Sequence, residues 1–161
     1  MIHQHLEVTD LLSRYELFST SISILYHDIQ KIERIEMAKF GLKGPHAQCL
    51  LAMSRYPEGI TAAQLCELTE KDKAAISRTV AEMEEAGLLY RVERNGLRYR
   101  AQLMLTEKGA AAARQVEERA TQVVAQASPG MSDEQRAFLY KALEQIAQNL
   151  HTLCKEGISE K

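Results

Sequence analysis

Basic side chains recur between residues 71 and 100 at spacings that suit binding to a polyanion. Seven lysines and arginines stand there against five acids, although the whole chain of 161 residues carries a formal net charge of −2. Lysine and arginine bind phosphate oxygens, and arginine also reads the edge of a guanine base through paired hydrogen bonds. Small residues beside them allow a helix to approach a groove closely. The candidate DNA-contacting residues are Lys73, Ala74, Ser77, Arg78, Arg91, Arg94, Arg98 and Arg100.

Two short helices joined by a tight turn are needed to position the first half of this set. Thr61 and Gln64 have the spacing of a capping box, which predicts the start of a short helix. Asp72 is a good N-cap for a second, longer helix, and Gly87 is a good residue to end it. This order predicts a helix-turn-helix over residues 61–87.

The longer of these helices is expected to have an inner and an outer face. Its apolar residues recur at helical spacing and predict a buried face made of Ile76, Val80 and Met83, with Thr79 beside them. The opposite side near the helix start carries the small and basic residues Lys73, Ala74, Ser77, Arg78 and Ala81. Three acids at the other end would be repelled by phosphate, so we expect the N-terminal half of the helix to face DNA.

A hairpin is expected to carry the remaining arginines. Asn95-Gly96 between two strand-like runs favours a two-residue turn, which predicts a β-wing over residues 88–105. That turn would place Arg94 opposite Leu97, Glu93 opposite Arg98, Val92 opposite Tyr99 and Arg91 opposite Arg100. Two opposed arginines repel each other unless an anion lies nearby, so we interpret Arg91 and Arg100 as neighbours of phosphate. Glu93 would hold Arg98 extended toward the wing tip.

Long helices are predicted on both sides of this region. Apolar residues step by four and three along the first of them, at Leu11, Tyr15, Phe18, Ile22, Leu25, Ile29 and Ile32, after a cap at Thr9 or Asp10. Similar seams follow Thr106 and Ser132, separated by Ser128-Pro129-Gly130. Such seams pack on other helices, and a protein that recognises a twofold-symmetric DNA site needs two DNA-binding lobes. We therefore expect a homodimer.

The predicted fold is mainly α with a small β-wing, and length favours one domain over residues 1–161. Within it, residues of about 9–40 and 107–155 form dimerisation helices. Residues of about 45–105, beginning with a helix at Pro45, form a winged helix-turn-helix DNA-binding lobe.

Composition excludes several other classes of protein. No apolar run is long enough for a membrane span, and the N-terminus lacks the basic and apolar regions of a signal peptide. Three cysteines without close pairing fit a reduced compartment, so a cytoplasmic location is expected. The sequence contains no nucleophile elbow, phosphate loop, zinc-protease helix or paired acid motif, so we expect no enzyme and no cofactor.

Alternatives with the same fold remain open. A winged helix can serve as a protein-interaction adaptor without binding DNA. Cys49, Cys66 or Cys154 would suit a redox sensor, although the first two lie among leucines and read as small core residues. The histidines at positions 3, 5, 27, 46 and 151 have no metal-ligand spacing apart from a terminal pair. Tyr15, Tyr26 and Phe40 would line an effector pocket, or else pack in the core.

The chain resembles the MarR family of bacterial winged-helix transcriptional regulators. The resemblance is carried by DKAAISRTVAEMEEAGLL (residues 72–89), by Arg98 and by LTEKG (residues 105–109), and the order of the flanking helices extends it over nearly the whole chain. The resemblance implies a homodimer that binds palindromic DNA, in most members as a repressor. In many members a small ligand, held between the dimer helices and the DNA-binding lobe, releases the protein from DNA. The resemblance also implies that Arg78 and Ser77 face DNA from the recognition helix, and that Arg98 enters the minor groove. The family's usual aspartate before that arginine is Leu97 here, which leaves the orienting role to Glu93.

Overall fold

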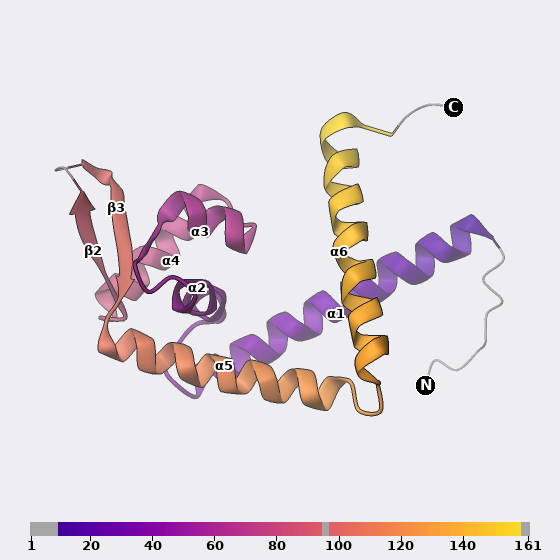
Figure 1. The fold of residues 1–161 in the computed structure, drawn as a ribbon, viewed down its shortest axis with the longest axis horizontal. Coiled ribbons are helices and arrows are strands. Elements are labelled where there is room, and N and C mark those ends of the chain that lie inside the picture. The colour runs from indigo at the N-terminus through magenta and orange to yellow at the C-terminus, as the bar shows by residue number, and fades with distance from the viewer. Residues whose placement is uncertain (1–9, 95–96, 159–161) are drawn as a thin grey trace. The chain divides into compact units, whose positions relative to one another are not determined.

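The structure is a computed structural model that describes residues 10–94 and 97–158, with the side chains of residues 93–100 outside the description. The chain forms two compact units, Met1–Ala120 and Thr121–Lys161. Figure 1 shows the order of the elements, which among the described residues are α1 (Leu11–Ala38), α2 (Gly44–Ser54), β1 (Ile60–Thr61), α3 (Ala62–Thr69), α4 (Lys73–Glu85), β2 (Leu89–Arg94), β3 (Leu97–Leu105), α5 (Glu107–Ala127) and α6 (Asp133–Glu156). The expected mainly helical fold with a small β-wing is confirmed.

The helices begin where polar side chains cap them. Asp10, Thr61, Asp72 and Ser132 each accept the backbone N–H of the residue three positions on, at 2.8–3.3 Å. Each cap satisfies one of the amides that a helix start leaves without a partner. Because these contacts are local in sequence, the predicted helix starts are confirmed to within one or two residues.

The wing is an antiparallel sheet with strand order β1-β3-β2. Its register differs from the predicted one. Arg94 pairs with Leu97 as expected, but Val92 pairs with Gln102 and Arg91 pairs with Leu103, with an irregularity between Val92 and Arg94. The prediction that Arg91 faces Arg100 and Val92 faces Tyr99 is therefore wrong.

Burial explains the observed register. Leu89 and Leu103, at 2% and 1% exposure, lie on the inner face of the hairpin, and Leu89 pairs with Leu105. A strand shifted by one residue would turn its inward residues toward solvent, so the buried leucines set the pairing at the base of the hairpin. The irregularity reconciles this pairing with the different register at the tip.

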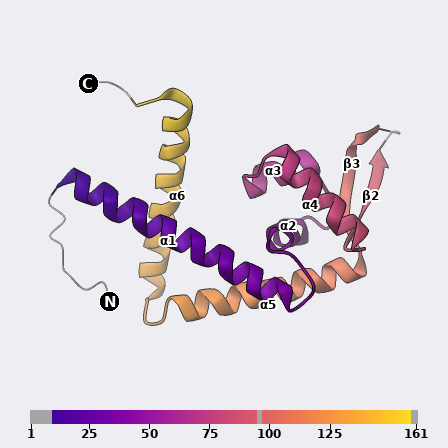
Figure 2. The ribbon, with the colours of Figure 1, turned by 180° about the vertical axis from the view of Figure 1, so that it is seen from behind.

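The core of the first unit lies among α2, α3, α4 and the sheet. Its fully buried side chains include Leu50, Ile60, Leu65, Ile76, Met83, Leu88 and Leu103. Figure 2 shows α4 between α3 and the hairpin, and α4 makes contacts with α2, α3 and β2. The core therefore holds α4 from three sides.

Apolar faces remain exposed on the long helices. On α1, Leu11, Tyr15, Ile22, Leu25, Ile29 and Ile32 of the predicted seam are each at least 38% exposed. On α6, in the second unit, Leu139, Leu143, Ile146, Leu150 and Leu153 are 37–47% exposed. Apolar surface on this scale is uncommon on a soluble monomer and is typical of interaction surfaces.

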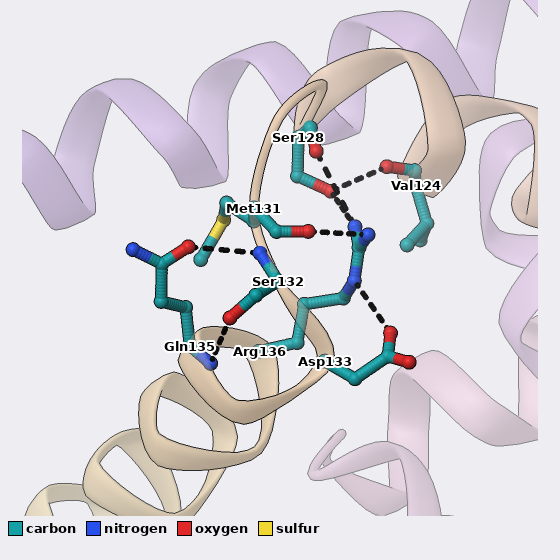
Figure 3. Close-up of polar contacts among 7 residues, drawn as sticks. All are labelled: Val124, Ser128, Met131, Ser132, Asp133, Gln135 and Arg136. Carbon is teal, nitrogen blue, oxygen red and sulfur yellow. Dashed lines mark hydrogen bonds and ion pairs between the residues drawn. The ribbon is translucent and has the colours of Figure 1, made fainter.

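The turn between α5 and α6 is fixed by one arginine of the second unit (Figure 3). Arg136 donates from Nη1 to the carbonyl and hydroxyl oxygens of Ser128, at 3.3 and 3.1 Å. From Nη2 it donates to the carbonyl oxygen of Met131 at 2.6 Å. Since the last carbonyls of a helix lack partners within the helix, this guanidinium satisfies part of the end of α5.

Candidate nucleic-acid interface

The α4 helix has the two faces that the sequence predicts. Ile76, Thr79, Val80 and Met83 are 0–6% exposed and face the core. On the outer side, the candidate residues Lys73, Ala74, Ser77 and Arg78 are all exposed, and Ala81 continues this face. The N-terminal half of α4 thus presents two cations and three small side chains to solvent. A surface of this composition suits close contact with a groove and its phosphates.

The start of α4 is held by Asp72. Its Oδ1 accepts the backbone N–H of Ala75 at 2.8 Å. This hydrogen bond lowers the pKa of the Asp72 carboxyl below its usual value, with smaller contributions from the Ala74 amide and the charge of Arg78. An ionised carboxylate is also favoured at the positive end of a helix dipole.

We predict that acid removes this cap. A carboxyl with a lowered pKa in the folded state stabilises the fold at pH values above its unfolded pKa, and that contribution is lost as the pH falls through the folded pKa. Asp72→Ala should therefore unfold at a lower temperature than the parent at pH 7, and the gap should shrink as the pH is lowered below 4. Thermal unfolding followed by circular dichroism measures both effects. A difference in unfolding temperature between parent and variant that is the same at pH 7 and below pH 4 would contradict the prediction.

Arg91 forms an ion pair with an acid of α4. It projects from β2 toward α4, where its Nε lies 2.9 Å from Oε2 of Glu84. Its side chain is 26% exposed. The predicted pairing of Arg91 with Arg100, from which the nearby phosphate was inferred, is wrong, because Arg91 pairs with Leu103. Contact of either arginine with DNA stays a prediction.

The other wing arginines are placed by their backbone only. Arg94 ends β2, and Arg98 and Arg100 belong to β3. Their side chains, and that of Glu93, lie outside the described residues, as does the Asn95-Gly96 turn. The roles of these arginines and the Glu93–Arg98 contact stay predictions.

Sequence reasoning missed a polar cluster behind α4. Lys43 Nζ and His46 Nε2, from the start of α2, lie 2.8 and 3.3 Å from the carboxylate of Glu82. His46 is only 4% exposed. A local signal for part of the cluster existed, because His46 occupies the third position of α2 and bonds back to its cap, as Gln64 does in α3. The contact with Glu82 joins residues 36 positions apart and had no such signal.

The three effector-pocket candidates are not brought together. Tyr15 and Tyr26 of α1 are 67% and 65% exposed. Phe40 instead lines a cavity of about 290 Å³ together with Leu42, Leu88, Lys108 and Gln115. Tyr15 and Tyr26 are not among its lining residues, so Phe40 is separate from the other two.

The cysteine and metal alternatives gain no support from the described residues. Cys49 is buried, and desolvation raises the pKa of its thiol to about 11, which keeps it protonated and unreactive. Cys66 is half-buried and Cys154 is exposed. The part of the chain that the structure describes holds no group of three metal-ligating side chains, and His3 and His5 lie outside it. Nor does any described helix have the length and hydropathy of a membrane span.

Part of the chain, including α4, matches the model of a known protein family. Residues 40–97 match the model of the MarR family, and this range contains α2, α3, α4 and β2. None of the curated protein sequences compared with the chain matches it.

Solved structures share the fold over most of the chain. A MarR family transcriptional regulator from Listeria monocytogenes, crystallised with a 26mer DNA, is 20% identical with a TM-score of 0.77, and the match covers 88% of this chain and 96% of that one. A MarR transcriptional regulator from Methanosarcina mazei Go1 is 22% identical, with a TM-score of 0.75 and coverage of 86% and 99%. A MarR family regulator from Rhodococcus sp. RHA1 is 18% identical, with a TM-score of 0.73 and coverage of 86% and 97%.

Proposed function

We propose that this chain is a winged-helix DNA-binding regulator of the MarR family and that it acts as a homodimeric repressor of a palindromic operator. Each α4 enters a major groove with its N-terminal half, and each wing lies along the flanking minor groove. A dimer of this kind reads two half-sites about one helical turn apart, roughly 10 bp centre to centre.

The outer face of α4 carries this proposal. Lys73, Ser77 and Arg78 are exposed on the side of the helix opposite Ile76 and Met83, which anchor it in the core. The acids of α4 lie in the last turn and a half, away from this patch. The structure from Listeria monocytogenes that shares this fold was solved with DNA, which supports the same use of the fold here.

The test is selection of a duplex from a random pool of about 30 base pairs, which leaves room for two half-sites one turn apart. The selected sequences should contain an inverted repeat, and affinity for them should fall steeply as salt rises, because bound phosphates release counterions. Failure to enrich any sequence, together with an affinity that does not respond to salt, would favour the adaptor function instead. Transcription from a promoter carrying the selected repeat then separates repression from activation.

The exposed seams of α1 and α6 support the dimer. Their apolar side chains lie in long continuous stripes that a second copy would cover. We predict a mass in solution of about twice the 18.2 kDa of one chain. Leu25→Lys, at a residue of the α1 stripe that is 55% exposed, should give the monomer mass because it places a charge in the interface.

Leu68 offers a matched control for this prediction. It is 50% exposed on α3, outside both stripes. Leu68→Lys should therefore keep the dimer mass in light scattering. A monomeric parent, or equal effects of the two variants, would contradict the assignment of the seam.

We further propose that the cavity beside Phe40 holds a small-molecule effector. The Nζ of Lys108, which lines the cavity, donates to the carbonyl oxygen of Ala86 at the end of α4 at 2.7 Å, so an occupant would lie next to the recognition helix. Compounds that release DNA should raise the unfolding temperature of the parent, as any ligand of the folded state does. They should have much less effect on Phe40→Ala, and an equal effect on both proteins would place the effector elsewhere.

A further inference from the structure

We propose that the acidic end of α4 is a joint, in which Glu82 and Glu84 are positioning residues that fix the recognition helix against α2 and against the wing. The inference deepens the proposed DNA-binding function and rests on it. From the sequence, the three acids Glu82, Glu84 and Glu85 only mark the end of the helix that phosphate would repel. The structure gives two of them specific partners on neighbouring elements.

Glu82 joins α4 to the first turn of α2. One of its oxygens, Oε1, accepts from Lys43 Nζ at 2.8 Å, and the other, Oε2, lies 3.3 Å from His46 Nε2. Hydrogen bonds from Lys43 and then His46 lower the pKa of the Glu82 carboxyl, which keeps it ionised at neutral pH. Both carboxylate oxygens are thus used by one neighbouring element, so their geometry resists rotation of α4 about its axis.

The buried ring of His46 can satisfy all its contacts in one state only. Its Nδ1 accepts the backbone N–H of Lys43 at 3.3 Å, so this nitrogen carries no proton. A neutral ring then has its proton on Nε2, which points at Glu82. His46 therefore links the cap of α2 to α4 through a defined tautomer.

Glu84 makes the second half of the joint. Its Oε2 lies 2.9 Å from Arg91 Nε, on the inner face of β2 where Arg91 pairs with Leu103. This contact ties the last turns of α4 to the hairpin at the base of the wing. Since the hairpin and the helix would read adjacent grooves, their relative orientation decides whether both can bind at once.

A purely electrostatic role and a positioning role predict opposite changes in DNA affinity when an acid of α4 is neutralised. Neutralising an acid that is only solvated removes its repulsion of phosphate, so DNA binding should become tighter. A positioning acid should weaken binding when neutralised, because α4 then loses its fixed orientation. Glu85 is the matched control, since it is exposed, lies on the same end of α4 and carries the same charge.

The experiment compares Glu82→Gln, Glu84→Gln and Glu85→Gln for affinity toward the duplex that the parent protein selects. We expect about three- to tenfold weaker binding for the first two, because each loses a charge-assisted contact on a partly exposed surface, and unchanged or slightly tighter binding for the third. The slope of affinity against salt should stay that of the parent in all three, because none of these residues contacts phosphate. Tighter binding by Glu82→Gln and Glu84→Gln, to the same degree as Glu85→Gln, would overturn the proposal.

His46→Gln provides a second route that keeps the helix start intact. Glutamine caps α3 and α6 from the same third position, through Gln64 and Gln135, so it should retain the cap of α2 while losing the contact with Glu82. Its loss of DNA affinity should match that of Glu82→Gln, and the double variant should add little more. Additive losses would overturn the link between the two residues.

Failure of the proposal is distinguishable from failure of the proposed function. If no duplex is selected by the parent, or if Arg78→Ala binds as the parent does, the assignment of α4 to DNA binding fails, whatever Glu82 and Glu84 do. If the parent selects a duplex and Arg78→Ala weakens binding while Glu82→Gln does not, α4 remains the DNA-binding helix and the positioning role of the joint is rejected. Thermal unfolding of each variant confirms that the compared proteins are folded.

Discussion

Gly109→Ala is expected to destabilise the fold by about 3 kcal/mol or more, the upper range for overpacking of a closed site. A Cβ at this position would lie 1.8 Å from the carbonyl oxygen of Leu88 and 2.8 Å from its carbonyl carbon. Both atoms belong to the backbone, so no side-chain rotation relieves the overlap. The first turn of α5 would have to separate from the segment that joins α4 to the wing.

Hydrogen bonds oppose that separation. Thr106 donates its backbone N–H to the Leu88 carbonyl at 3.0 Å and its hydroxyl to the Gly87 carbonyl at 2.7 Å. The same hydroxyl oxygen accepts the N–H of Gly109 at 3.0 Å. Thr106 and Gly109 thus seat the start of α5 directly on the end of α4, and a methyl group at position 109 would break several of these bonds together.

Gly44 supplies the matched control. It also lies in the first turn of a helix, and a Cβ there would meet Arg34 only at ordinary contact distances of 3.7 Å and beyond. Gly44→Ala should leave the free energy of unfolding, measured by urea titration, unchanged or slightly higher, because alanine favours helix over glycine. Equal stability of the two variants would contradict the role assigned to Gly109.

Local signals in the sequence predicted the elements well, because each was carried by residues near one another in the chain. Thr61 with Gln64, Asp72 with the amide of Ala75, and Ser132 with Gln135 act over three positions, so their geometry follows from their spacing. The inner face of α4 was also predictable, since the period of Ile76, Val80 and Met83 matches a helix.

Contacts between distant residues were not predictable in the same way. The register of the wing depends on which leucines the core buries, and the turn at Asn95-Gly96 carries no information about that choice. The short strand β1, at Ile60 and Thr61, exists only because β3 lies beside it. Arg91 is an example, since no signal in the sequence indicated its ion pair with Glu84.

Arg78→Ala is expected to weaken binding to the selected operator by about 1–3 kcal/mol, the range for loss of a base-reading arginine. Arg78 is exposed on the outer face of α4, one turn beyond Ala74, and the small residues beside it leave room for a base edge. Its guanidinium can donate two parallel hydrogen bonds to one guanine, which a smaller side chain cannot replace. Titration of the labelled duplex, followed by fluorescence anisotropy, measures the loss.

Arg78→Lys separates base reading from charge. Lysine keeps the positive charge, so the salt dependence of binding should remain that of the parent, whereas Arg78→Ala should lower the slope by about one if the arginine also neutralises a phosphate. Lysine lacks the planar fork, so discrimination between the operator and a duplex with one substituted guanine should fall in both variants. If Arg78→Lys instead discriminates as well as the parent, Arg78 contacts the DNA backbone, and sequence recognition must come from Ser77, from the wing or from the shape of the DNA itself.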